Sequence, residues 1–245
     1  MLKEDHLFES SCSGSNDFQF NTEVAEVFDD MVTRSIPFYV EQQRMIQEIG
    51  KTFCPRGASI YDLGCATATT LINLCQVIQE CAGFVGYDNS NAMLKYAKEK
   101  VCEKKLEDRI DLRCGDLNAD LVTRPLENAG LVTLCWTLQF IRPVHRDRVI
   151  RWIYESLSHG GALVMAEKIV TSNTQTNRLF IDNYYDLKRR NGYSDNEIAR
   201  KRAALENVLV PYTISENLEM IRRNGFKIVD TFFQWYNFAA FLCLK

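Results

Sequence analysis

The sequence predicts an open α/β sheet, mostly parallel, with helices on both faces. Short apolar runs alternate with helical segments through the middle of the chain, and the first run passes directly into a cluster of very small residues at 64–68. Strands that alternate with helices form parallel sheets, because each helix carries the chain back across one face. The 245 residues, 46% hydrophobic and 25% charged, suit one such domain.

Two helices are expected ahead of the sheet. The apolar spacing is helical from residue 21 to residue 53, with Pro37 between two segments. Residues 1–20 are polar and rich in serine, so we expect them to be mobile and residues 21–245 to form a single ligand-binding domain. Strands are then expected at 58–63, 83–87, 110–113, 130–136 and 161–166, with helices at 69–80, 92–104 and 144–157.

The alternation ends after Lys168. Residues 172–210 are polar, helical in pattern and rich in basic side chains, which indicates a helical insertion. The chain finishes with a helix at 215–224 and neighbouring strands at 226–232 and 236–244, which predict an antiparallel hairpin. A seven-stranded, mostly parallel sheet with one antiparallel edge strand is the plan of the Rossmann-like fold of S-adenosylmethionine-dependent methyltransferases.

Acidic residues at strand ends predict a nucleoside site. Asp62 and Gly64 follow the first strand, where small residues let a ligand approach backbone N–H groups. Asp88 and Asp116 end the next two strands, and the carboxyl ends of parallel strands meet at one edge of the sheet. Asp88 suits a ribose diol and Asp116 an adenine amino group. Taken singly, each is equally typical of a helix cap or a turn.

The loop after the first strand favours S-adenosylmethionine over a nicotinamide dinucleotide. Ala66 and Ala68 stand where a dinucleotide-binding loop has glycines that admit a pyrophosphate. The end of the fourth strand, residues 136–139, is where the reactive end of such a ligand is expected. Trp136 in this segment also suits the core.

Composition excludes several classes of function. A formal net charge of −3 gives no broad surface for nucleic acid, so direct binding of tRNA or DNA is not expected. The nine cysteines and three histidines have no metal-ligand spacing, which argues against a metal site and for buried thiols in a reducing compartment. No apolar run or leader suggests a membrane segment, so we expect a cytoplasmic protein.

Long strings outside the common fold resemble the bacterial carboxy-S-adenosylmethionine synthase family from about Phe20 to Leu244. They are VAEVFDDMVTRSIPFY, YDLGCA, YDNSNAM, TLQF, GGALVMAEK, LKRRNGYSDNEIARKR, LENVL and FQWYNF. The resemblance implies that S-adenosylmethionine and prephenate become carboxy-S-adenosylmethionine and phenylpyruvate. It also implies a homodimer and a downstream carboxymethyltransferase that forms the 5-oxyacetyl group on wobble uridine of tRNA.

The resemblance implies a set of cofactor contacts and one catalytic residue, Arg202, which grips the new carboxylate. The contacts are Tyr39, Gly64, Cys65, Ala66, Asp88, Asn89, Asp116, Leu117, Cys135 and Arg202. This role suits arginine, because a guanidinium binds a carboxylate bidentately. Without the resemblance, the sequence pattern favours a solvated Arg202 on a basic helix. Where this chain has Ala66 and Cys135, the family usually has serine and asparagine. Loss of an asparagine hydrogen bond costs about 1 kcal/mol.

A mechanism without a general acid–base side chain follows from this reading. The sulfonium acidifies its methyl group, and prephenate loses carbon dioxide and hydroxide as its ring becomes aromatic. The hydroxide takes a proton from the methyl group, and the ylide formed in this way captures the carbon dioxide. Prephenate is a dianion, so cations must meet it; Arg202 is the first candidate, followed by Arg34, Lys188 and Arg189. Two alternatives stay open: a small-molecule methyltransferase, and a protein that only binds the carboxylated cofactor.

Overall fold

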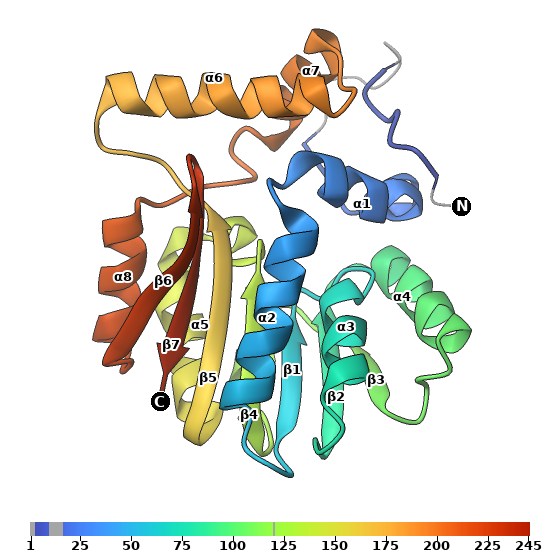
Figure 1. Ribbon diagram of the computed structural model, residues 1–245, viewed down its shortest axis with the longest axis vertical. Coiled ribbons are helices and arrows are strands. Elements are labelled where there is room, and N and C mark those ends of the chain that lie inside the picture. Colours follow the sequence, from blue (N-terminus) through green and yellow to red (C-terminus); the bar gives the residue numbers. More distant parts are fainter. Residues whose placement is uncertain (1–2, 10–16, 120) are drawn as a thin grey trace.

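A seven-stranded sheet in the order β3-β2-β1-β4-β5-β7-β6 forms the centre of the molecule (Figure 1). The computed structural model describes residues 3–9, 17–119 and 121–245. The strands are β1 (Ser59–Leu63), β2 (Gly83–Asp88), β3 (Ile110–Cys114), β4 (Ala129–Cys135), β5 (Leu157–Lys168), β6 (Ile228–Trp235) and β7 (Phe238–Leu244). β1 to β5 pair in parallel, and β7 runs antiparallel to β5 and β6. The predicted fold class is confirmed.

The reversed strand lies one place inside the edge predicted for it. After the insertion that follows β5, the chain passes through helix α8 (Ile214–Arg223) and forms β6 two places away from β5 in the sheet. One strand position is thereby left between β5 and β6. The two-residue turn Tyr236-Asn237 then returns β7 into that position, where it completes hydrogen bonding on both sides. The hairpin predicted from the sequence is present, and β6 is the edge strand.

Helices cover both faces of the sheet and create two separate cores. Helices α2 (Tyr39–Phe53), α3 (Thr69–Val77) and α4 (Asn91–Glu103) lie on one face, and α5 (Pro143–Ser156) and α8 lie on the other (Figure 1). Side chains alternate along a strand. In β1, Ile60 therefore packs with α2 and α3, while Tyr61 and Leu63 pack with α5 and α8.

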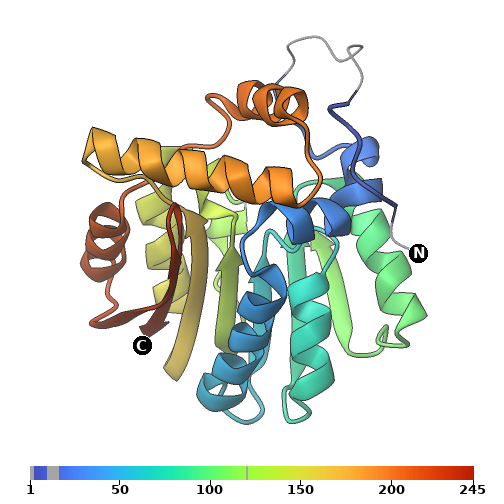
Figure 2. The same cartoon turned by 45° about the horizontal axis from the view of Figure 1, so that its top comes forward.

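The remaining helices lie over the carboxyl ends of the parallel strands. These are α1 (Thr22–Ser35), α6 (Thr174–Arg190) and α7 (Asp195–Leu205); the last two form the predicted insertion (Figures 1 and 2). Short 3₁₀ turns, η1 (Leu121–Thr123) and η2 (Leu138–Phe140), precede and follow β4. Ser194 and Glu197 form a reciprocal capping box that begins α7.

Hydrogen bonds join the two ends of the insertion to each other and to the segment after β4. The Val170 N–H donates to the Tyr212 carbonyl at 3.2 Å, and the Val210 N–H donates to the Gln139 carbonyl at 2.9 Å. The buried guanidinium of Arg146 donates to the Val210 carbonyl at 2.7 Å. Entry and exit of the insertion are therefore anchored beside the ends of β4 and β5.

The N-terminal segment contacts the same upper region. Asp5 is 1% exposed and accepts a hydrogen bond from the Tyr193 hydroxyl at 2.7 Å, while the Phe18 N–H donates to the Ala204 carbonyl at 2.8 Å. The expectation of mobility for residues 1–20 falls in part on residues 1–2 and 10–16, which lie outside the described residues. Residues 3–9 and 17–20 pack against α1 and α7 at these contacts.

Cysteines follow the expected burial only in part. Cys65, Cys75 and Cys243 are buried, but Cys102 and Cys114 are exposed, because they lie on the outer face of α4 and at the end of the edge strand β3. Within the described residues, no helix is both long and apolar enough to cross a lipid bilayer.

Candidate functional site

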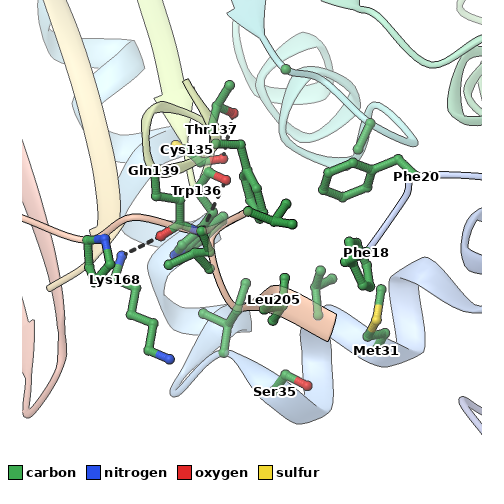
Figure 3. A pocket seen from close by; sticks show the side chains of 18 of the residues that line it. Phe18, Phe20, Met31, Ser35, Cys135, Trp136, Thr137, Gln139, Lys168 and Leu205 are labelled. Carbon is green, nitrogen blue, oxygen red and sulfur yellow. Dashed lines mark hydrogen bonds between the residues drawn. The ribbon is translucent and has the colours of Figure 1, made fainter. Parts of the chain in front are cut away.

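A cavity of about 740 Å³ lies between the carboxyl ends of the parallel strands and the helices above them (Figure 3). Pockets for small molecules usually measure roughly 300–1,000 Å³. Loops after β1, β2, β3 and β4 form one wall, and α1, α6, α7 and the N-terminal Phe18 and Phe20 form the other. Every contact residue expected from the sequence lines it: Tyr39, Gly64, Cys65, Ala66, Asp88, Asn89, Asp116, Leu117, Cys135 and Arg202.

The loop after β1 brings backbone close to the cavity. Gly64, Ala66 and Ala68 have positive φ angles of 79°, 47° and 61°. A Cβ at Gly64 would overlap the Thr137 side chain and lie 3.0 Å from its Cβ, so only glycine fits. Alanines in the left-handed region store strain, a feature concentrated at ligand sites.

The N–H groups of this loop already have partners inside the protein. Those of Gly64 and Cys65 donate to the Tyr87 carbonyl at 2.8 and 2.9 Å, and that of Ala66 donates to Asp88 Oδ2 at 2.8 Å. The backbone N–H groups that the sequence analysis expects a ligand to approach are thus already bonded within the protein at these three residues. Their bonds instead fix the loop to β2 and orient the Asp88 carboxylate.

Two carboxyl groups stand at the adjacent strand ends. Asp62 is 3% exposed, accepts a hydrogen bond from Thr133 Oγ1 at 2.7 Å, and has its pKa raised to about 7 chiefly by burial. Burial also raises the pKa of Asp88, against the opposing effect of N–H donors from Ser90 and Ala66. Each Asp88 oxygen accepts one of these N–H groups, which holds the carboxylate in a fixed plane.

Asp116 lines the cavity and also accepts a hydrogen bond within the turn that follows β3. Its Oδ1 accepts the N–H of Asn118 at 2.8 Å, the pattern of an Asx turn. Leu117, which follows, is 7% exposed and presents apolar surface to the cavity. Asn89 is exposed at the rim.

The segment after β4 is held from below by Glu167. Its carboxylate oxygens accept the N–H groups of Leu138 and Gln139 at 3.0 and 2.8 Å. The Gln139 side-chain oxygen accepts the Lys168 N–H at 2.9 Å, as Figure 3 shows. Trp136, with a φ of 54°, contacts Tyr39 in a tilted arrangement with 5.4 Å between the ring centres. These bonds position the Cys135–Gln139 segment along the cavity.

The expected cations divide into two groups. Arg202 lines the cavity from α7, is exposed, and has no hydrogen bond or ion pair within the described part of the chain. Lys188 also lines the cavity. Arg34 and Arg189 do not: Arg34 is bonded to Asp30 and the Asp5 carbonyl, and Arg189 pairs with acids on the outer surface. Neither arginine is therefore placed to meet a ligand in the cavity of this chain.

Four further residues that line the cavity were missed in the sequence analysis: Lys168, Lys201, Tyr184 and Asn237. Lys168 ends β5, so the rule that places ligands at strand ends could have found it. Lys201 precedes Arg202 on α7, and helical geometry puts it on the buried side. Asn237 comes from the β6–β7 turn, for which the sequence carries no comparable signal.

Comparison with known sequences gives one domain match over part of the chain and relatives that match nearly all of it. A family model described as "Methyltransferase domain" matches residues 60–161. The chain is 46% identical over 245 residues to a carboxy-S-adenosyl-L-methionine synthase of Methylococcus capsulatus, covering 100% of both chains. It is 43% identical over 228 residues to the synthase of the same description in Nautilia profundicola, covering 93% of this chain and 94% of that one.

Solved structures agree on the fold. A putative S-adenosyl-L-methionine-dependent methyltransferase from Methanococcus maripaludis superposes with a TM-score of 0.64 at 18% identity, covering 95% of this chain and 97% of that one. An O-methyltransferase family protein from Burkholderia thailandensis gives a TM-score of 0.71 at 15% identity, covering 95% and 65%. Among the described residues, no group of three or more His, Cys, Asp or Glu side chains could hold a metal ion.

The buried Asp62 makes stability depend on pH. Its pKa rises from an ordinary 3.8 to about 7 in the folded protein, so between these values the folded state keeps a proton that the unfolded state releases. The free energy of unfolding should therefore fall as pH rises from 4 to 7, on the order of 2–4 kcal/mol from this group. Urea unfolding of wild type and Asp62→Asn should show that only wild type has this component.

The matched control is Asp230→Asn, which changes an exposed aspartate on β6. Glu167, whose pKa burial raises to about 8, contributes equally to all three proteins. Identical pH profiles for wild type and Asp62→Asn would contradict the prediction.

Proposed function

The chain belongs to the carboxy-S-adenosyl-L-methionine synthase family, and on this premise we propose that it converts S-adenosyl-L-methionine and prephenate into carboxy-S-adenosyl-L-methionine and phenylpyruvate. One observation of the cavity supports this most strongly. Acidic strand ends suited to a nucleoside, with Asp88 among them, face a wall that carries Arg202 and buried lysines. A methyl donor alone has no use for so many cations.

The residues at the strand ends suit S-adenosyl-L-methionine. Each oxygen of Asp88 accepts one backbone N–H and keeps a lone pair for a ribose hydroxyl. Gly64 lets the loop after β1 pass directly against Thr137, where a Cβ would overlap that side chain. Asp116 and Leu117 offer an acceptor and an apolar surface for the adenine, and Cys135 with Tyr39 flanks the methionine end. These roles for the contact residues are part of the proposal.

The proposed reaction needs placement and dryness more than a general base. Loss of carbon dioxide and hydroxide from prephenate restores an aromatic ring, the hydroxide takes a proton from the sulfonium methyl group, and that carbon bonds to the carbon dioxide. The chain must keep water out while these steps occur. The rings of Phe18, Phe20, Phe140 and Trp136 line the cavity, and Phe20 packs edge-on against Phe140 at 5.2 Å.

Arg202 is assigned to the carboxyl group that is transferred. It reaches the cavity from α7 without an acidic partner in the described chain, so its guanidinium is free to receive an anion. Two parallel N–H donors match a carboxylate better than one ammonium does. Cys135, in place of the family's usual asparagine, removes one donor and increases the dependence on Arg202.

The proposal extends to partners and location. We propose a homodimer in the cytoplasm; Phe38 and Val40, which are 61% and 72% exposed at the start of α2, supply apolar surface for such an interface. The product serves a separate carboxymethyltransferase that completes the 5-oxyacetyl group on wobble uridine of tRNA. This chain itself, at a net charge of −3, is not expected to bind the RNA.

The match of residues 60–161 to a methyltransferase domain favours one alternative, a methyltransferase for a small molecule. That enzyme would form S-adenosylhomocysteine and have no need of prephenate.

One incubation tests the proposed function. Purified protein with S-adenosyl-L-methionine and prephenate should yield a nucleoside heavier by one carbon dioxide, together with phenylpyruvate, when the mixture is read by mass spectrometry. Omission of prephenate should abolish the product. Formation of S-adenosylhomocysteine would support the alternative, and an unchanged mixture would leave a binding protein and contradict the proposal.

Replacing Arg202 tests its assigned role. Arg202→Ala should lower the affinity for carboxy-S-adenosyl-L-methionine by about 10- to 100-fold, because a charged hydrogen-bonded partner is lost. Affinity for S-adenosyl-L-methionine should fall less. The control is Arg190→Ala, an exposed arginine at the end of α6 outside the cavity. Wild-type affinity for the carboxylated ligand in Arg202→Ala, measured by calorimetry, would refute the assignment.

A further inference from the structure

Three lysines from three different elements line the same end of the cavity. Lys168 ends β5, Lys188 lies in the last turns of α6, and Lys201 lies on α7. Lys188 and Lys201 are 5% and 7% exposed, an uncommon degree of burial for a lysine. Figure 3 shows the side chain of Lys168 leading away from the hydrogen bond that its backbone N–H makes with Gln139. The helical insertion thus brings α6 and α7 over a strand end that already carries a cation.

These ammonium groups lack matching anions. Asp5 Oδ2 lies 3.7 Å from Lys201 Nζ, but Asp5 also accepts the Tyr193 hydroxyl. Within the described residues, no carboxylate lies within ion-pair distance of Lys168 or Lys188. Instead the Tyr184 ring centre lies 5.0 Å from Lys168 Nζ and 4.9 Å from Lys188 Nζ. A ring face attracts a cation but does not neutralise it.

The pKa values of the three lysines show that their surroundings disfavour the charged form. Burial lowers the pKa of Lys168 and of Lys201 to about 8. Burial, followed by repulsion from Lys201 and Lys168, lowers the pKa of Lys188 well below its ordinary range. A cluster that destabilises the free protein is typical of a binding site that a ligand completes.

Unpaired polar atoms lie beside the lysines. Neither the indole Nε1 of Trp136 nor the side-chain amide of Asn237 has a hydrogen-bond partner in the described structure, although Asn237 is 2% exposed. Both residues line the cavity. Asn237 immediately precedes Phe238, which pairs with Lys168 across β5 and β7. Trp136 and Tyr184 pack in one apolar cluster with Phe238. Buried donors without partners indicate a missing acceptor.

We propose that Lys168, Lys188 and Lys201, together with Asn237 and the Trp136 indole N–H, form a subsite for a carboxylate of the anionic co-substrate. This inference rests on the proposed function, because it takes prephenate as the dianion to be held. The sulfonium is itself a cation and is repelled by the lysines, so the cluster selects the second substrate. Arg202 is then left for the carboxyl that is transferred, and the lysines hold the side-chain carboxylate that phenylpyruvate retains.

Two variants separate this subsite from the cofactor site. Lys188→Met and Lys168→Met keep side-chain volume and remove the charge, and Lys227→Met changes an exposed lysine before β6 as the control. The KM for prephenate, followed through carboxylated product, should rise about 10- to 100-fold in both cavity variants. The Kd for S-adenosyl-L-methionine should change little, since the proposed nucleoside contacts come from the loops after β1, β2 and β3, and the lysines come from β5, α6 and α7. Thermal unfolding of unliganded Lys188→Met should occur at the wild-type temperature or above it.

The outcomes are distinct. An unchanged KM for prephenate in both variants overturns the subsite while leaving the proposed function intact. A loss of S-adenosyl-L-methionine affinity alone overturns it as well, because the lysines would then hold the methionine carboxylate. A second measurement does not depend on turnover: calorimetry of prephenate binding to protein loaded with S-adenosylhomocysteine. If wild type forms no carboxylated product yet binds prephenate more tightly than Lys188→Met, the proposed function fails and the subsite stands.

Discussion

The gathering of three lysines, two of them buried, beside a single nearby carboxylate is the constraint on which the region above the sheet depends. Lys168 belongs to the sheet, while Lys188 and Lys201 belong to helices of the insertion. Mutual repulsion and desolvation both oppose their approach. Packing must hold them together, and it does so through Tyr184, which is 7% exposed between two of the ammonium groups.

Contacts outside the lysines maintain this packing. Asp5 reaches Lys201 from the N-terminal segment and is itself held by Tyr193 and by Arg34, whose guanidinium donates to the Asp5 carbonyl at 2.7 Å. Arg34, considered from the sequence as a substrate cation, is thus structural. The buried Arg146 anchors the far end of the insertion. Within the described residues these contacts bring no second carboxylate within ion-pair distance of the three lysines, which agrees with the proposed anion subsite.

The sequence predicted the sheet and the meeting of the strand-end acids at one cavity, because both depend on local pattern. Apolar runs end at Asp62, Asp88 and Asp116, and parallel strands bring such ends together whatever the helices do. The position of β7 was harder to predict, since hydrogen-bonding order depends on which gap a hairpin fills. The bond from the Gly64 N–H to the Tyr87 carbonyl was also not foreseen, because it joins two strands that are distant in sequence. Such tertiary contacts leave no periodic signal.

The cationic wall of the cavity was only half predictable. Arg202 was identified through resemblance, and Lys188 through its charge alone. Lys201 and Asn237 could not be identified because their burial depends on how α7 and the β6–β7 turn meet the sheet. A basic helix appears solvated until one knows which of its faces is covered: Arg202 is exposed at the rim while its neighbour Lys201 is 7% exposed.

Proton uptake on substrate binding tests the role of the buried lysines most directly. Prephenate would be titrated calorimetrically into protein loaded with S-adenosylhomocysteine, which has no methyl group to react, in two buffers of different ionisation enthalpy. Slightly above pH 8, Lys168 and Lys201 are partly neutral, and an arriving carboxylate raises their pKa. Binding should therefore take up protons, and Lys168→Met should take up fewer. Binding without proton uptake, or with proton release, would contradict the account.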